Sequence, residues 1–172
     1  MTPALPLPDP PLEDDVVLLR AWSAPDAATL AEAWSDHEVR RWTRVPEDCS
    51  LAAARHWIAA DAARRERGLA LDLVVERRVD GSAVGEVGLV CVDPGRGLAE
   101  AGWWTGAAFR RQGLAGRAVA LLAGWALSEL SVEQVFARLD PANVGSVGVA
   151  RAAGFAPRGT ASDGREVWSR RA

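Results

Sequence analysis

The sequence is defined first by what it lacks. Its 172 residues include neither lysine nor tyrosine, so all 20 of its basic residues are arginines. Its only cysteines are Cys49 and Cys91, and its only histidines are His37 and His56. Two isolated cysteines do not make the disulfide framework of a small secreted protein, and these four residues lack the spacing of metal ligands. We therefore expect no structural disulfide and no metal site.

A strong net charge and long apolar runs are missing too. The formal net charge of −3 argues against nucleic acid as a partner, because nucleic-acid-binding domains carry basic surfaces. The most apolar stretch, residues 118–127, is far shorter than the roughly 20 residues of a membrane-spanning helix. Residues 1–11 are rich in proline and lack the basic start and apolar core of a signal peptide. We expect a protein of the reducing cytoplasm, without a membrane partner, as a monomer or a homodimer.

The hydrophobic pattern indicates a single domain. A proline-rich arm, residues 1–12, precedes a folded domain, residues 13–172, because a chain of this length with 49% hydrophobic residues can bury one sizeable core. Apolar and alternating runs predict strands, and apolar residues at helical spacing predict helices. The expected strands span residues 16–22, 70–76, 83–92, 100–105, 134–139, 155–160 and 166–170. The expected helices span residues 23–34, 35–42, 50–67, 118–130 and 143–153.

This order of elements predicts an α+β (mixed α/β) fold with a mixed, mostly antiparallel sheet of about seven strands and helices on both faces. The three strands between residues 70 and 105 are joined by short turns and should form an antiparallel meander. A helix then returns the chain to the sheet, so the fifth strand should run parallel to the fourth. Where these two strands splay apart, a cleft should open beside the segment that leaves the fourth strand.

That segment, residues 109–118, has the composition of an anion-binding loop. It leads into a helix, whose first turn has four backbone N–H groups without intrahelical acceptors and a dipole that favours negative charge. Gly113 would let a phosphate approach the backbone closely, and Arg110 and Arg111 add permanent positive charge. The alternative is a solvated arginine pair at the start of a helix, and this segment alone does not separate the two interpretations.

A second motif follows the fifth expected strand. Residues 140–146 open a helix that ends at Gly154 and Phe155. By itself this motif has a structural explanation, because Asn143 is a good N-terminal cap and Gly154 a good left-handed C-terminal residue. The pattern becomes specific when it is combined with the arginine–glycine loop at this spacing.

With both motifs the chain resembles the GNAT acetyltransferase superfamily over about residues 14–171. The branch it resembles is that of the Rim-type enzymes, which acetylate the N-termini of ribosomal proteins. Arg110, Gly113 and Ala115 match the acyl-CoA motif of the superfamily. The pairs Asn143/Ser146 and Gly154/Phe155 match the second signature of the branch.

The resemblance implies that acetyl-CoA is the co-substrate. Its pyrophosphate would lie on backbone N–H groups of the loop, and its pantetheine arm would lie along the splayed edge of the fourth strand. The cofactor-binding residues that the resemblance implies are Trp104, Thr105, Arg110, Arg111, Gln112, Gly113, Leu114, Ala115, Gly116 and Asn143.

The chemistry implied is direct attack of an amine on the thioester, which needs a base for the amine and a proton for the leaving thiolate. Ser146 would supply the hydrogen bond or proton to the CoA sulfur, a role often given to tyrosine in this superfamily. Glu100 would be the general base, and Glu86 and Glu166 are alternatives.

The acceptor would be a protein N-terminal α-amine or a small-molecule amine. Two other functions remain open at this point. One is transfer of a larger acyl group, such as succinyl, on the same fold, and the other is a non-catalytic acyl-CoA-binding regulatory module.

Overall fold

The computed structural model describes residues 4–172, which form one eight-stranded sheet. The strands are β1 (Leu12–Glu13), β2 (Val17–Ala21), β3 (Ala70–Arg77), β4 (Ser82–Asp93), β5 (Leu98–Thr105), β6 (Gln134–Leu139), β7 (Ala156–Thr160) and β8 (Glu166–Arg171). Their order across the sheet is β1-β2-β3-β4-β5-β6-β8-β7. Neighbouring strands are antiparallel except β5 and β6, which are parallel. The predicted mixed, mostly antiparallel sheet is therefore confirmed.

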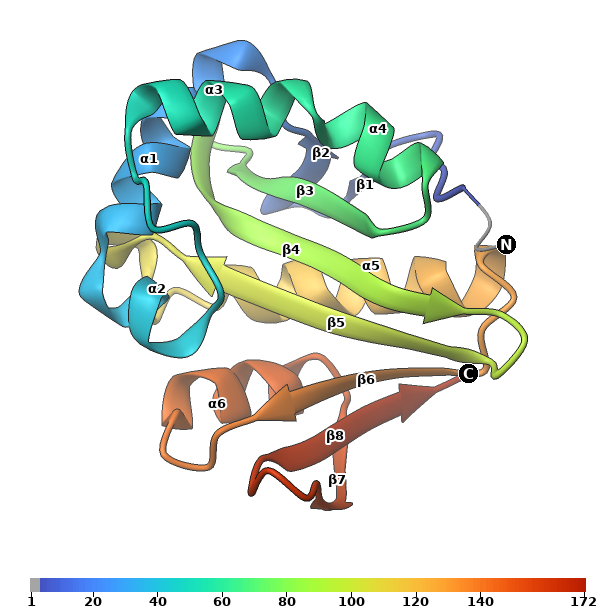
Figure 1. Ribbon diagram of the computed structural model, residues 1–172. Helices are drawn as coiled ribbons and strands as arrows, with labels where there is room; N and C mark the ends of the chain where they lie inside the picture. The colour runs from blue at the N-terminus through green and yellow to red at the C-terminus, as the bar shows by residue number, and fades with distance from the viewer. Residues whose placement is uncertain (1–3) are drawn as a thin grey trace.

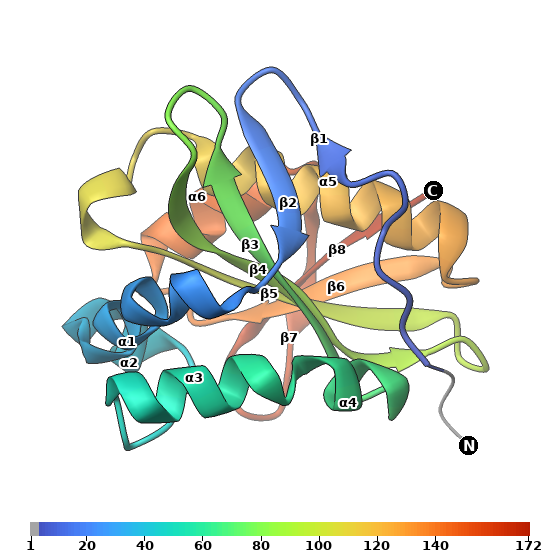
Figure 2. The same ribbon diagram turned by 90° about the horizontal axis from the view of Figure 1, so that it is seen from above.

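Helices cover both faces of this sheet, as predicted. The helices are α1 (Ala27–Ser35), α2 (His37–Trp42), α3 (Leu51–Ala59), α4 (Asp61–Glu66), α5 (Leu114–Glu129) and α6 (Val144–Ala152), with 3₁₀ turns η1 (Ala24–Asp26) and η2 (Ala107–Phe109). Helices α1 to α4 lie on one side of the sheet and α5 and α6 on the other (Figures 1 and 2).

The larger core lies between the sheet and α5. Helix α5 buries a stripe that includes Leu114, Val119 and Leu122, against fully buried strand residues such as Leu73 and Val87. At about 0.8 kcal/mol for each buried methylene group, apolar side chains of this size make this layer the main source of stability. The layer fixes the position of α5, and with it the position of the loop before α5.

The other face of the sheet has a smaller, aromatic core. Trp22, at the end of β2, stacks on Trp104 of β5 with ring centroids 6.2 Å apart. Trp57 of α3 meets Trp22 and Trp34 edge-on, at 6.2 and 6.0 Å. Aromatic pairs in these geometries stabilise beyond their area burial, so the indoles hold α1 and α3 against the sheet.

The parallel pair in the centre of the sheet is short. Strands β5 and β6 pair only through Leu98, Ala99 and Glu100 of β5. Both strands continue beyond this point, so residues 101–105 of β5 have no pairing with β6 while they stay paired with β4. This is the predicted splay between the fourth and fifth strands of the sequence analysis, which are β5 and β6 here.

Three details differ from the sequence-based expectations. Helix α5 begins at Leu114, directly after the glycine of the loop, rather than at residue 118. The helix expected over residues 50–67 is two helices, and the second begins at the buried Asp61, whose carboxylate binds Arg65 at 3.0 Å. Strand β1 was not expected, because two residues are too few to show a period.

Candidate active site

The loop before α5 adopts an unusual backbone conformation. Gly113 is the residue before the helix and has φ +77°, and Arg111 has φ +64°. Both lie in the left-handed region, which glycine adopts at little cost. No side chain caps the first turn of α5. The N–H groups at the start of this 16-residue helix are therefore available to an anion.

Arg110 has a structural task in addition to its charge. Its Nε donates to the Thr105 carbonyl at 3.0 Å, and its Nη2 donates to Oδ1 of Asp36 at 2.6 Å. Asp36 caps α2 by accepting from the N–H of Val39. Burial would raise the pKa of Asp36, but the hydrogen bonds from Arg110 and Val39 outweigh it and lower this pKa. Arg110 thus ties the end of β5 to the start of α2.

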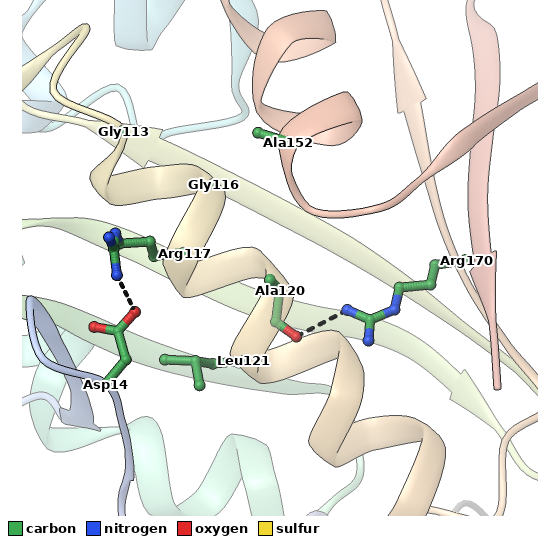
Figure 3. A pocket seen from close by; sticks show the side chains of 8 residues that line it. All are labelled: Asp14, Gly113, Gly116, Arg117, Ala120, Leu121, Ala152 and Arg170. Carbon is green, nitrogen blue, oxygen red and sulfur yellow. Dashed lines mark hydrogen bonds and ion pairs between the residues drawn. The ribbon is translucent and has the colours of Figure 1, made fainter.

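A pocket of about 360 Å³ lies beside the N-terminal half of α5 (Figure 3). Its lining residues on α5 are Gly113, Gly116, Arg117, Ala120 and Leu121, and Asp14, Ala152 and Arg170 complete it. Arg117 binds Asp14 at 2.8 Å, and Arg170 donates to the carbonyl of Ala120 at 3.1 Å. A Cβ on Gly116 would lie 3.1 Å from the Cβ of Ala152, so this glycine lets α6 approach α5.

The open edge of β5 contains the other cofactor-site candidates. Trp104 and Thr105 lie in the part of β5 that is no longer paired with β6. Their neighbour Trp103 has a buried indole nitrogen without a hydrogen-bond partner among the described residues. Sequence reasoning did not identify Trp103, because a lone tryptophan in a strand has no distinguishing pattern.

The second motif starts α6, as expected. Asn143 is the N-terminal cap, and its Oδ1 accepts from the backbone N–H of Ser146 at 3.1 Å. Ser146 is half-buried in the first turn of α6. Helix α6 follows β6, so both residues lie at the end of the strand that diverges from β5 (Figure 1).

Glu100 is held in an ion pair. Its two oxygens accept from Nε and Nη2 of Arg138 on β6, at 2.9 and 2.7 Å. This bidentate pair bridges β5 and β6 at the last residue where the two strands are paired. A proton-accepting role for Glu100 would have to compete with a guanidinium that occupies both of its oxygens.

Glu86 on β4 has a different environment. Its Oε2 accepts from the indole N–H of Trp22 at 2.9 Å, and its Oε1 accepts from that of Trp104 at 3.0 Å. Burial raises the pKa of Glu86, the charge of Asp72 raises it further, and the two indole hydrogen bonds offset only part of the shift. The residue keeps part of its surface in contact with solvent. Among residues 4–172 no cation forms an ion pair with Glu86, although the charge of Arg64 lowers its pKa in part, so this carboxylate is a candidate for a general base.

Glu166, the third carboxylate that the sequence suggested, lies away from these groups. It opens β8, and its Oε2 accepts from the indole N–H of Trp168 at 2.8 Å. Trp168 belongs to the core on the α5 and α6 side, and Glu166, two residues before it, points to the same side. Glu86 and Trp104 belong to the opposite side, with the aromatic core.

Among residues 4–172 no three or more His, Cys, Asp or Glu side chains gather in a way that could hold a metal ion. Within the same range, no helix has the length and apolar character that crossing a membrane requires.

Comparison with known proteins gives a consistent result. The sequence model of the family described as "Acetyltransferase (GNAT) domain" matches residues 17–156. An uncharacterized N-acetyltransferase p20 from Bacillus licheniformis is 25% identical over 145 residues, which are 84% of this chain and 82% of that protein.

Solved structures with the same fold are also found. One is Mycobacterium smegmatis RimJ in complex with CoA-disulfide, with a TM-score of 0.81, 22% identity, and coverage of 94% of this chain and 86% of that one. Another is the ribosomal-protein-S5-alanine acetyltransferase from Vibrio fischeri, with a TM-score of 0.79, 18% identity, and coverage of 94% and 96%.

Two paired glycines shape the sheet surface on the side of Glu86. Gly88 of β4 pairs with Gly102 of β5, on the same side of the sheet as Glu86. A Cβ on Gly88 would lie 2.8 Å from both the Leu71 carbonyl and Oδ1 of Asp72, whereas a Cβ on Gly102 would meet nothing within 4 Å. The sheet surface is therefore filled at Gly88 and hollow at Gly102.

The two glycines should respond differently to a methyl group. We expect Gly88→Ala to destabilise the protein by about 1–3 kcal/mol, because a backbone carbonyl blocks the new Cβ. Gly102→Ala should be neutral or stabilise by up to about 1 kcal/mol, because the site is open and alanine reduces the freedom of the unfolded chain. Urea unfolding of the two variants beside the parent protein measures this difference. Equal stabilities would show that the space at the two positions is not as described.

Proposed function

The chain belongs to the GNAT acetyltransferase family and is an acyl-CoA-dependent N-acetyltransferase. From this premise we propose that it transfers the acetyl group of acetyl-CoA to a protein N-terminal α-amine, with a small-molecule amine as the alternative acceptor. We further propose Glu86 as the general base and Ser146 as the hydrogen-bond donor to the leaving sulfur.

The observation that carries this proposal is the combination of an open strand edge with an uncapped helix start. Residues 101–105 of β5 offer backbone groups that β6 does not use, and the first turn of α5 begins a few residues further along the chain. The amide groups of a pantetheine arm can hydrogen-bond to the open edge of β5, and a pyrophosphate can bind the N–H groups at the start of α5. The pocket beside Gly113 and Gly116 adjoins this helix start (Figure 3).

The proposed chemistry is a single transfer in a ternary complex. Glu86 accepts a proton from the acceptor ammonium, and the neutral amine nitrogen then forms a bond to the thioester carbonyl carbon. The nitrogen then carries an excess proton, which it loses as the carbon–sulfur bond breaks, and the thiolate of CoA takes up one proton through the Ser146 hydroxyl, so that the products are the amide and the free thiol. A carboxylate whose pKa is raised is suited to the first step, because general bases work best with a pKa near the operating pH.

The acceptor class follows from the same matching of pKa values. An α-ammonium group has a pKa of about 8, so a modest base can deprotonate it. A lysine ammonium has a pKa of about 10.4 and requires a much stronger base. In the part of the chain that the structure describes, the side chains that hydrogen-bond to Glu86 are the indoles of Trp22 and Trp104, neither of which is a base. The Vibrio fischeri structure of the same fold is named for an alanine of a ribosomal protein. These points together favour an α-amine.

The proposal is tested by a screen of acceptors in which release of free CoA thiol is followed and products are identified by mass. Peptides with a free N-terminus should turn over, and the same peptides with a blocked N-terminus should not, even when they contain lysine. Turnover of a polyamine or aminoglycoside in preference to the peptides would favour the small-molecule alternative. Absence of turnover with every amine, despite CoA binding, would support a binding module.

Gly113 provides a test of the cofactor site. We expect Gly113→Glu to weaken CoA binding by at least about tenfold, because a side chain and a negative charge would occupy the start of α5. The matched control is Gly81→Glu, since Gly81 is also left-handed with nothing within 4 Å of a Cβ but lies in the β3–β4 turn. Calorimetry with CoA compares the two variants. Equal affinities would place the anion site elsewhere.

Ser146 should affect the chemical step alone. Ser146→Ala should lower kcat on the order of tenfold with little change in KM for acetyl-CoA, because its hydroxyl is proposed to act on the leaving sulfur. Ser128→Ala is the control, since the Ser128 hydroxyl only donates to the Trp125 carbonyl near the end of α5. A kcat equal to that of the parent protein would leave Ser146 as a helix-start residue.

Glutamine variants should separate the two candidate bases. Glu86→Gln should lower kcat/KM by about 10²-fold or more at neutral pH, and the loss should shrink as pH rises and the acceptor deprotonates by itself. Glu100→Gln should cost much less, because Arg138 already occupies that carboxylate. Rate profiles over about pH 6 to 9 decide between them. Full activity of Glu86→Gln together with a large loss in Glu100→Gln would return the role to Glu100.

A further inference from the structure

A second carboxylate lies beside the proposed base, and the activity described so far does not use it. Asp72 is a polar residue between Leu71 and Leu73, which are both fully buried in β3. Its side chain is only 14% exposed and lies on the side of the sheet that faces α4. Burying a carboxylate in an apolar strand is costly, and a buried carboxylate in a cleft is a candidate for a functional role.

The register of the sheet brings Asp72 towards Glu86. Val74 of β3 pairs directly with Glu86, and Asp72, two residues earlier, pairs with Gly88. Asp72 is therefore the diagonal neighbour of Glu86 on the same face, a position from which long side chains can interact. Gly88 has no side chain in between, and a Cβ there would lie 2.8 Å from Oδ1 of Asp72. The glycine leaves room for the Asp72 carboxylate to lie over β4.

Asp72 lies near a guanidinium, at a longer distance than in the other ion pairs of α4. Its one cationic neighbour among the described residues is Arg64 of α4, at 3.6 Å. Arg64 lies closer to Asp61, at 3.4 Å, and also donates to the Trp57 carbonyl at 2.7 Å. Asp61 in turn binds Arg65 at 3.0 Å. Two guanidiniums thus face two carboxylates, but Arg65 binds only Asp61, and Arg64 lies farther from Asp72 than from Asp61.

The charge of Arg64 also lowers the pKa of Glu86, so it offsets part of the effect of burial and of Asp72. The end of β2 and β5 contribute the neutral indoles of Trp22 and Trp104. Further along β3, Glu76 binds Arg20 at 2.6 Å, and the same guanidinium binds Asp26 at 2.8 Å. These two carboxylates share one guanidinium, so one net negative charge remains there. The carboxylate whose charge raises the pKa of Glu86 is Asp72, its diagonal neighbour in the sheet.

We propose that Asp72 is a positioning residue of the active site, whose negative charge strengthens the affinity of Glu86 for the acceptor's proton. The inference rests on the proposed function of Glu86. When Glu86 is charged, the two carboxylates repel each other, and this repulsion is relieved when Glu86 takes the proton from the ammonium. Burial and the charge of Asp61 raise the pKa of Asp72 as well, while Arg64 opposes the shift.

The inference can be tested without an acceptor, because two tryptophans report on Glu86. Its carboxylate accepts from the indoles of Trp22 and Trp104, so its protonation should change their fluorescence. A titration over about pH 5 to 9 of the parent protein and of Glu86→Gln isolates the Glu86 transition among the 8 tryptophans. In Asp72→Asn the midpoint should move to lower pH by about one unit.

Charge and shape are separated by further variants. Asp72→Glu keeps the charge and should stay near the parent midpoint, and Asp72→Ser gives a smaller uncharged side chain in case the asparagine variant does not fold. Asp93→Asn, at the end of β4 and away from Glu86, is the control for loss of one surface carboxylate. The acidic limb of kcat/KM should move with the fluorescence midpoint in each variant, while KM for acetyl-CoA stays constant.

Each result bears on a different part of the argument. A fluorescence midpoint that is the same in Asp72→Asn, Asp72→Ser and the parent protein overturns the coupling, even if Glu86 proves to be the base. A midpoint that moves while the acidic limb of kcat/KM stays in place shows that Glu86 is not the base, and so overturns both proposals. Movement of both to lower pH supports both.

Discussion

The organisation of this protein depends on where one pair of strands stops pairing. The parallel strands β5 and β6 pair at three positions and then separate, although neither strand ends there. Unpaired backbone groups in the middle of a sheet are costly unless something satisfies them. The Glu100–Arg138 ion pair marks the point of separation, and α5 and α6 start on the two sides of the gap. The gap thus provides a binding edge inside the sheet, where most folds have continuous pairing.

The two faces of the sheet have different proposed roles. The α5 side is a conventional aliphatic core, and its task is to hold one helix start in place. The other side uses indoles, which pack like apolar groups and also donate hydrogen bonds, so a carboxylate can be held there without a cation. An arginine in place of the indoles would have lowered the basicity of Glu86. Arg110, through Asp36, connects the loop before α5 with helix α2 on the opposite side.

The sequence was sufficient for the elements whose signals are local. The left-handed Gly154, the cap at Asn143 and the crossover that makes β6 parallel to β5 follow from residue types and spacing, and all three are present. The environments of the carboxylates depend on partners far away in sequence, such as Arg138 for Glu100 and Trp22 for Glu86, and no local pattern contains them. Asp72 could have been noticed as a charge in an apolar strand, but its position beside Glu86 requires the strand register. The roles proposed for Ser146, Glu86 and Glu100 remain predictions.

All the side-chain cations in the ion pairs described above are guanidinium groups, because the chain contains no lysine. A guanidinium stays protonated at any physiological pH and is a poor nucleophile, whereas a lysine side chain is an amine that a thioester can acylate. No side chain of this protein therefore competes with the acceptor for the acetyl group as a primary amine. The enzyme can be exposed to high concentrations of its own acylating co-substrate without losing positive charge from its surface.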